Sequence, residues 1–150
     1  MSKKYEQASK ISQLNKVPLG YAVKPSKHLA VKGIVSNGLY SLKALPKGHV
    51  IGRYRGKVLT LAEALKKKNN RSYMFDVKVK KKVIHVIDAG NKKTSSFVRF
   101  ANAADTDDQQ NTKFVQKGTE VFLVSLERIP KNTELLTWYG KQTADVIDQK

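Results

Sequence analysis

The sequence predicts a mainly β fold with short helices. From Val17-Pro18 onward, short runs of β-branched and aromatic residues alternate with Gly, Pro and Asn turns, a pattern typical of strands joined by tight turns. Strands do not alternate with long helical patterns, so a βαβ protein is not indicated. A chain of 150 residues with 40% hydrophobic content can bury one core, which favours a single domain with one site.

The two ends of the chain differ from its middle. Residues 1–16 are polar and lysine-rich with few apolar positions, and are predicted to be a basic flexible arm or a loosely docked helix. The domain itself is predicted to span residues 17–140. Residues 141–150 are expected to be a short C-terminal tail.

The first half of the domain is predicted to hold four strands and a helix. The apolar and β-branched runs that predict strands are Leu29–Lys32, Leu39–Leu45, Val50–Tyr54 and Lys57–Leu59. Thr60 and Glu63 have the spacing of a capping box, in which each side chain satisfies a free backbone amide of the other's turn. Apolar residues then recur at helical spacing, so one short helix is predicted to end near Lys68.

The second half is predicted to begin with a β-hairpin of Tyr73–Val79 and Val83–Ile87, joined by a charged tip at Lys80–Lys82. Ser95 is predicted to cap a short helical stretch that carries Phe97 and Phe100. The remaining strands are expected at Lys113–Gln116, Val121–Leu126 and Glu134–Trp138.

The net charge of +17 is unevenly placed along the chain. Residues 1–75 hold 16 Lys and Arg residues against two acids, Glu6 and Glu63, whereas residues 76–150 hold 13 against 10. A basic front half with a net charge of +14 favours contact with nucleic acid or a nucleosome. A solubilising surface is the alternative explanation for the lysine runs.

Composition also excludes several classes of site. There are no cysteines, which rules out disulfides, zinc knuckles and cysteine nucleophiles. The three histidines have no ligand spacing, so no metal is predicted. Lysines occur throughout the first thirty residues, and no run approaches the roughly 18 apolar residues of a membrane span. An intracellular protein without a membrane partner is therefore expected.

Four separated runs resemble, in order and approximate spacing, those of the SET domain of protein lysine methyltransferases. They are Ser36-Asn37-Gly38-Leu39-Tyr40, Ser72-Tyr73-Met74-Phe75-Asp76 with Ile87-Asp88-Ala89, Arg99-Phe100-Ala101-Asn102, and Glu134-Leu135-Leu136-Thr137-Trp138-Tyr139-Gly140. The segment Asn102-Ala103-Ala104, its acidic continuation, Gln109-Gln110-Asn111 and the ending Leu135 to Gly140 are similar to the PR branch of that family.

The resemblance implies a SET-domain fold, in which several small sheets surround a threaded, pseudoknot-like C-terminal segment. Residues 141–150 are expected to be a tail without the cysteine-rich post-SET zinc module of many family members. The implied activity is methylation of lysine side chains, with S-adenosylmethionine as cofactor, on histone or another basic chromatin-associated protein. A nuclear, chromatin-associated location follows from that substrate, and a homodimer is one way to cover the cofactor without the zinc module.

The resemblance also assigns residues to roles. Tyr139 and Tyr73 would be catalytic, with Tyr73 also lining the channel for the substrate lysine. The cofactor-binding set would be Asn37, Gly38, Leu39, Arg99, Phe100, Asn102 and Ala103. Gly38 suits this role because no side chain separates its backbone from a ligand. For Arg99, an arginine buried against backbone carbonyls is an equal alternative, and Trp138 is expected to pack.

The acidic residues Asp105, Asp107 and Asp108 are predicted to face the substrate, because local negative charge would attract a basic tail to a basic enzyme. Two other functions compete with the enzyme. One is a PR-like binding module for chromatin or protein partners with little or no methyltransferase activity, favoured by Ala103 at a position where many family members have histidine. The other is a basic nucleic-acid-binding β domain, supported by Arg53-Tyr54-Arg55.

Overall fold

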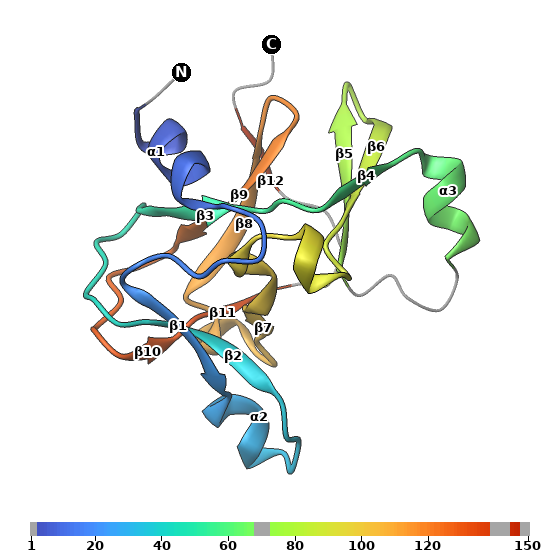
Figure 1. Cartoon of the computed structure of the whole chain (residues 1–150). Helices are drawn as coiled ribbons and strands as arrows, with labels where there is room; N and C mark the ends of the chain where they lie inside the picture. Colours follow the sequence, from blue (N-terminus) through green and yellow to red (C-terminus); the bar gives the residue numbers. More distant parts are fainter. Residues whose placement is uncertain (1–2, 68–72, 139–144, 148–150) are drawn as a thin grey trace.

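The computed structural model describes residues 3–67, 73–138 and 145–147 (Figure 1). The helices are α1 (Lys3–Ile11), α2 (Lys27–Val31), α3 (Leu61–Lys66) and the 3₁₀ helices η1 (Lys92–Thr94), η2 (Phe97–Phe100) and η3 (Asp107–Gln109). The strands are β1 (Tyr21–Pro25), β2 (Asn37–Ser41), β3 (Val50–Arg53), β4 (Lys57–Leu59), β5 (Met74–Val79), β6 (Lys82–Asp88), β7 (Asn102–Ala103), β8 (Thr112–Lys117), β9 (Glu120–Ser125), β10 (Thr133–Glu134), β11 (Leu136–Thr137) and β12 (Asp145–Ile147).

The described strands form four small sheets, which confirms the mainly β prediction. Their orders are β1-β2-β10, β11-β7, β12-β8-β9-β3 and β4-β6-β5. The predicted hairpin is present, as β5 pairs with β6, and two later predicted strands pair with each other as β8 and β9; both pairs are antiparallel. The predicted capping box is also present: the Thr60 amide donates to Glu63 Oε1 at 2.9 Å and the Glu63 amide donates to Thr60 Oγ1 at 3.1 Å.

The predicted strand at Leu29–Lys32 is wrong, because these residues belong largely to helix α2. Ser26 caps the helix and accepts a hydrogen bond from the Leu29 amide at 3.0 Å. The Glu134 carboxylate accepts a second bond from the His28 amide at 3.0 Å. Two otherwise unpaired amides of the first turn are thereby satisfied, one of them by a residue from the far end of the sequence.

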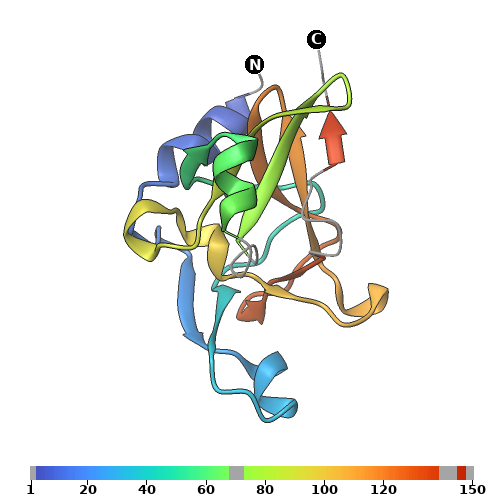
Figure 2. The same cartoon turned by 90° about the vertical axis from the view of Figure 1, so that its right-hand side faces the viewer.

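Of the two alternatives for residues 1–16, a docked helix is what the structure contains. In α1, Tyr5 and Ala8 are buried, and the Tyr5 ring meets the Phe122 ring edge-on with centroids 4.9 Å apart. Ser12 accepts from the Arg53 amide at 2.8 Å, which fastens the end of the helix to β3. Helix α1 lies against the four-stranded sheet in both views (Figures 1 and 2).

The C-terminal segment runs between strands from distant parts of the chain. The predicted strand Glu134–Trp138 is divided, because β10 pairs with β2 whereas β11 pairs in parallel with β7. Between them the Leu135 amide donates to the Leu39 carbonyl at 2.8 Å. The predicted tail 141–150 also contains a strand, since β12 pairs in parallel with β8. Three residues carry too little pattern for sequence reasoning to find them.

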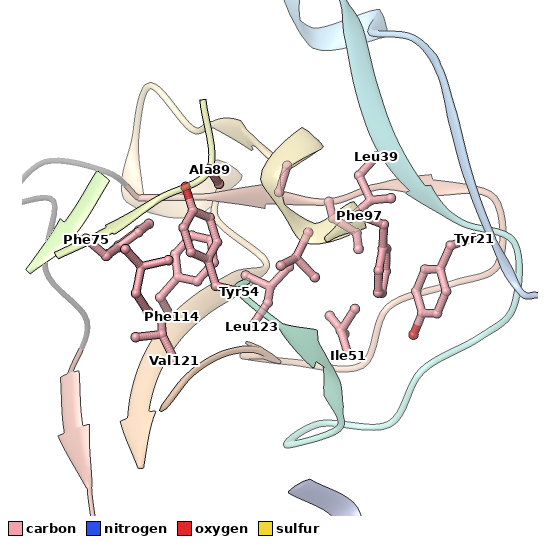
Figure 3. Close-up of a cluster of buried hydrophobic side chains, with 14 of the residues drawn as sticks. Tyr21, Leu39, Ile51, Tyr54, Phe75, Ala89, Phe97, Phe114, Val121 and Leu123 are labelled. Atoms are coloured by element: carbon pink, nitrogen blue, oxygen red, sulfur yellow. The ribbon is translucent and has the colours of Figure 1, made fainter. Parts of the chain in front are cut away.

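One aromatic core holds these sheets together (Figure 3). Tyr54, Phe75 and Phe114 contact one another with ring centroids 4.6 to 5.3 Å apart. At the other side of the core, Leu39 of β2 is fully buried near Phe97 of η2. This packing fixes β2 relative to η2, and therefore relative to β7, which follows η2 directly. Within the described residues, no helix has the length and apolar character needed to cross a membrane.

Candidate functional site

The beginning of β2 and the strand β7 lie side by side. Asn102 Nδ2 donates to the Asn37 carbonyl at 2.9 Å, which joins the first and third of the four runs. One edge of β7 pairs with β11, in the register Leu136 to Asn102 and Thr137 to Ala103. The other edge has no strand partner among the described residues. We call this meeting of β2, β7 and the β10–β11 segment the strand junction.

Glu134 is the centre of the strand junction. Its carboxylate accepts from Ser26 Oγ at 2.6 Å and from the His28 amide at 3.0 Å. Asn102 Nδ2 and the Tyr40 hydroxyl each lie 3.4 Å from one of its oxygens. Burial of the hydroxyl and the nearby carboxylate raise the pKa of Tyr40, which therefore stays a neutral phenol. A single carboxylate thus connects α2, β2 and β7.

Gly38 has a structural reason to be glycine in addition to its predicted role beside the cofactor. A Cβ atom at this position would overlap Glu134 Oε2 and would lie 3.1 Å from Asn102 Nδ2. The space in front of the Gly38 backbone therefore belongs to the Glu134 carboxylate. The glycine is required by a partner within the protein, which the sequence argument did not foresee.

Arg99 forms a second cluster, on the helix that leads into β7. Its side chain is 7% exposed, and Nε donates to the Ala89 carbonyl at 2.7 Å while Nη2 donates to the Gly90 carbonyl at 3.3 Å. The guanidinium lies 4.3 Å from the centroid of the Tyr73 ring and 4.7 Å from that of Phe100. This is the buried arginine weighed in the sequence analysis, and its planar group stacks on two rings.

Tyr73 is held by its backbone as well as by Arg99. Its carbonyl accepts from the Tyr54 hydroxyl at 2.6 Å and from the Ala89 amide at 2.9 Å. The predicted residues therefore fall into two groups joined by Ala101: Asn37, Gly38, Asn102 and Ala103 at the strand junction, and Tyr73, Arg99 and Phe100 around the guanidinium. The Leu39 side chain lies in the core.

The acidic loop, which carries Asp105, Asp107 and Asp108, already makes contacts within the protein. Asp105 Oδ1 accepts from Lys32 Nζ at 2.7 Å, and Asp105 Oδ2 lies 3.2 Å from His28 Nε2. The hydrogen bond from Lys32 lowers the pKa of Asp105, which is therefore a carboxylate at neutral pH with a partner already in place. Asp107 and Asp108 are also exposed, on η3, where Asp108 Oδ1 accepts a hydrogen bond from Thr106 Oγ1 of the same loop.

Two aromatic residues close the fourth run. Trp138 was expected to pack, but its side chain is 55% exposed. The neighbouring Tyr139, the predicted catalytic residue, lies outside the described residues. Sequence reasoning missed Ser26, His28 and Glu134 as parts of the site. Glu134 is the first residue of the fourth run, and this position was the one sequence signal that it belongs to the site. The position does not predict which groups donate hydrogen bonds to its carboxylate.

Comparison with known proteins agrees with this geometry. Residues 26–150 match the family described as PR domain zinc finger protein 2, PR domain. The chain is 30% identical to PR domain zinc finger protein 14 of Mus musculus over 103 residues, which are 69% of this chain and 18% of that protein. It is 26% identical to histone-lysine N-methyltransferase PRDM7 of Homo sapiens over 121 residues, which are 79% of this chain and 24% of that protein.

A solved structure supports the fold. The methyltransferase domain of human PR domain-containing protein 2 superposes with a TM-score of 0.65 at 23% identity, covering 91% of this chain and 84% of that one. The chain spans less than a quarter of the length of the two relatives named above. By the matched family and by its fold, this chain belongs to the PR domain family, the SET-related branch that its four runs resemble.

Proposed function

We propose that this protein methylates lysine side chains of histone or of another basic, chromatin-associated protein, with S-adenosylmethionine as methyl donor. The observation that carries the proposal is the hydrogen bond of 2.9 Å from Asn102 to the Asn37 carbonyl, which brings the two cofactor-binding runs together. Support comes from a PR-family relative that is named a histone-lysine methyltransferase. A nuclear location follows from the proposed substrate.

The residues at the strand junction fit such a cofactor. The edge of β7 that faces away from β11 presents backbone N–H and C=O groups, which match the donors and acceptors of an adenine and of an amino-acid group. The exposed Ala103 adds no large side chain at this edge. When bound there, S-adenosylmethionine supplies an electrophilic methyl group on a sulfonium.

The chain must also keep the substrate amine neutral. A free lysine has a pKa of about 10.4, so little of it is neutral at pH 7. In the proposed channel beside Tyr73, the Arg99 guanidinium lies 4.3 Å from the ring centroid and disfavours a second cation nearby. The lysine proton would leave to water, and the residues of this channel would align the neutral amine with the carbon–sulfur bond of a bound S-adenosylmethionine, which would supply the methyl group. Alignment of the amine with that bond supplies most of the rate.

The test is transfer of labelled methyl groups to mixed histones and nucleosomes by wild type and by Tyr139→Phe. We expect label on lysine with wild type, and a rate lower by about tenfold or more in the variant, because one hydroxyl that orients the amine is lost. If calorimetry shows cofactor binding but neither protein transfers label, the proposal is contradicted and the binding-module function replaces it. Ala103 favours that second function.

Charge reversal tests the substrate-facing role of the acidic loop. Asp107→Lys/Asp108→Lys is expected to raise the KM for a lysine-rich peptide severalfold and to leave cofactor affinity unchanged. Asp105→Asn is a separate variant, because Asp105 also holds Lys32. An unchanged KM in the double variant would remove Asp107 and Asp108 from the substrate site.

A further inference from the structure

The β5–β6 hairpin ends in three exposed lysines, Lys80, Lys81 and Lys82. In both views the hairpin projects from the body of the protein, at the end where the N-terminal helix α1 also lies (Figures 1 and 2). We call these three residues the lysine tip. It carries three positive charges at the most protruding part of the hairpin.

The backbone of the lysine tip adopts a conformation that lysine disfavours. Lys80 has a φ of 51° and Lys81 a φ of 69°, so both central residues of the two-residue turn are left-handed. Hairpin turns with this geometry strongly prefer Asn-Gly, because a Cβ atom is disfavoured there. Lysine at both positions makes the turn less stable than it could be. Such local conflicts are typical of residues retained for function.

The hairpin is also fixed in place. Gln116 of β8 is fully buried, and its amide accepts from the Lys78 amide at 3.1 Å and donates to the Lys78 carbonyl at 2.6 Å. The ladder of β5 and β6 has an irregularity at the same point, between Val77 and Lys78. This clamp presents the lysine tip in one orientation instead of leaving it on a free arm.

Strand β8, which Gln116 links to the hairpin, and helix α1 carry further lysines. Lys117 at the end of β8 and Lys4 of α1 lie over the same ring, with Nζ 5.0 and 5.7 Å from the centroid of Tyr5. Three elements therefore present lysines at one end of the protein.

We propose that the lysine tip, with Lys4 and Lys117, binds the phosphate backbone of duplex DNA. Several lysines held at fixed positions can each neutralise a phosphate of the duplex backbone. Contacts of this kind do not read the base sequence. Elements that lie on a lipid surface pair such charges with Trp, Phe or Leu side chains that insert into the bilayer, whereas the exposed large apolar residues of the hairpin are Val79 and Ile84, at 37% and 47% exposure. This DNA contact is independent of the methyl transfer proposed above.

The experiment uses Lys80→Asn/Lys81→Gly, which removes two charges and installs the preferred turn sequence. Its Tm is expected to rise, so weaker binding cannot be ascribed to unfolding. The matched control is Lys47→Asn/Lys131→Asn, which removes two exposed lysines from the turns that follow the Leu45–Ile129 bridge. The measurement is affinity for duplex DNA as a function of salt.

We expect the tip variant to bind roughly tenfold or more weakly and the slope of log K against log salt to fall by about 1.8, since each lost phosphate contact removes about 0.9. The control should retain most of the affinity. Equal losses in both variants would mean that net charge alone binds DNA. Undiminished binding by the tip variant, or binding of wild type to anionic vesicles but not to DNA, would also overturn the proposal.

Discussion

Gly38→Ala is expected to slow methyl transfer by about a hundredfold and to weaken S-adenosylmethionine binding, because a displacement of about 1 Å at a positioned site can cost this much in rate. The added methyl group would overlap Glu134 Oε2. The carboxylate must then move, and its hydrogen bonds from Ser26 Oγ and the His28 amide are lost or lengthened. We also expect a loss of about 2–3 kcal/mol in the free energy of unfolding.

A double mutant tests whether the effect of Gly38→Ala comes from the overlap of the new methyl group with the Glu134 carboxylate. Glu134→Ala removes the atoms that the new methyl group meets, so adding Gly38→Ala to it should cost far less than in wild type. Gly33→Ala is the matched control: nothing lies within 4 Å of its Cβ, but its φ of +77° is disfavoured for alanine. It should lose about 1 kcal/mol of stability and keep cofactor affinity. Additive effects of Gly38→Ala and Glu134→Ala would show that the two do not meet.

Arg99→Met is expected to lower the free energy of unfolding by about 3 kcal/mol. Methionine fills a similar volume but donates no hydrogen bond, so the carbonyls of Ala89 and Gly90 lose their charged donor in a buried place. The rings of Tyr73 and Phe100 lose the cation between them. Chemical denaturation measures the loss.

Arg128→Met makes the same chemical change at an exposed position. It should alter stability by no more than about 0.5 kcal/mol. Arg99→Met should also shift the pH dependence of methyl transfer to higher pH, because removing a cation near Tyr73 lets the substrate amine hold its proton longer. A pH profile identical to wild type would limit Arg99 to a structural role.

Elements with local signals could be predicted from the sequence. The capping box of Thr60 and Glu63 and the β5–β6 hairpin depend on residues a few positions apart, and the structure contains both. Helix α2 could not be predicted in this way. Its five residues carry little periodicity, and one of the side chains that accept hydrogen bonds from its first turn is Glu134, 106 residues from His28.

The sequence identifies several residues of the site, but it does not predict the side-chain contacts between them. The four runs identify Asn37, Gly38 and Asn102, which the structure brings together. They give no sign that the space beside Gly38 is filled by Glu134, or that Asp105 is already paired with Lys32. Both facts depend on side chains that meet only after the sheets have assembled, so no local pattern records them.

S-adenosylmethionine is proposed to bind at the strand junction, and an NMR titration of labelled protein with the cofactor tests this binding. We expect the amide signals of Asn37, Gly38, Asn102 and Ala103 to shift first and most. A separate cavity of about 600 Å³, lined in part by Leu14, Gly56 and Asn91, offers a built-in comparison. Shifts confined to that cavity, or no shifts at saturating cofactor, would show that the strand junction does not bind the cofactor.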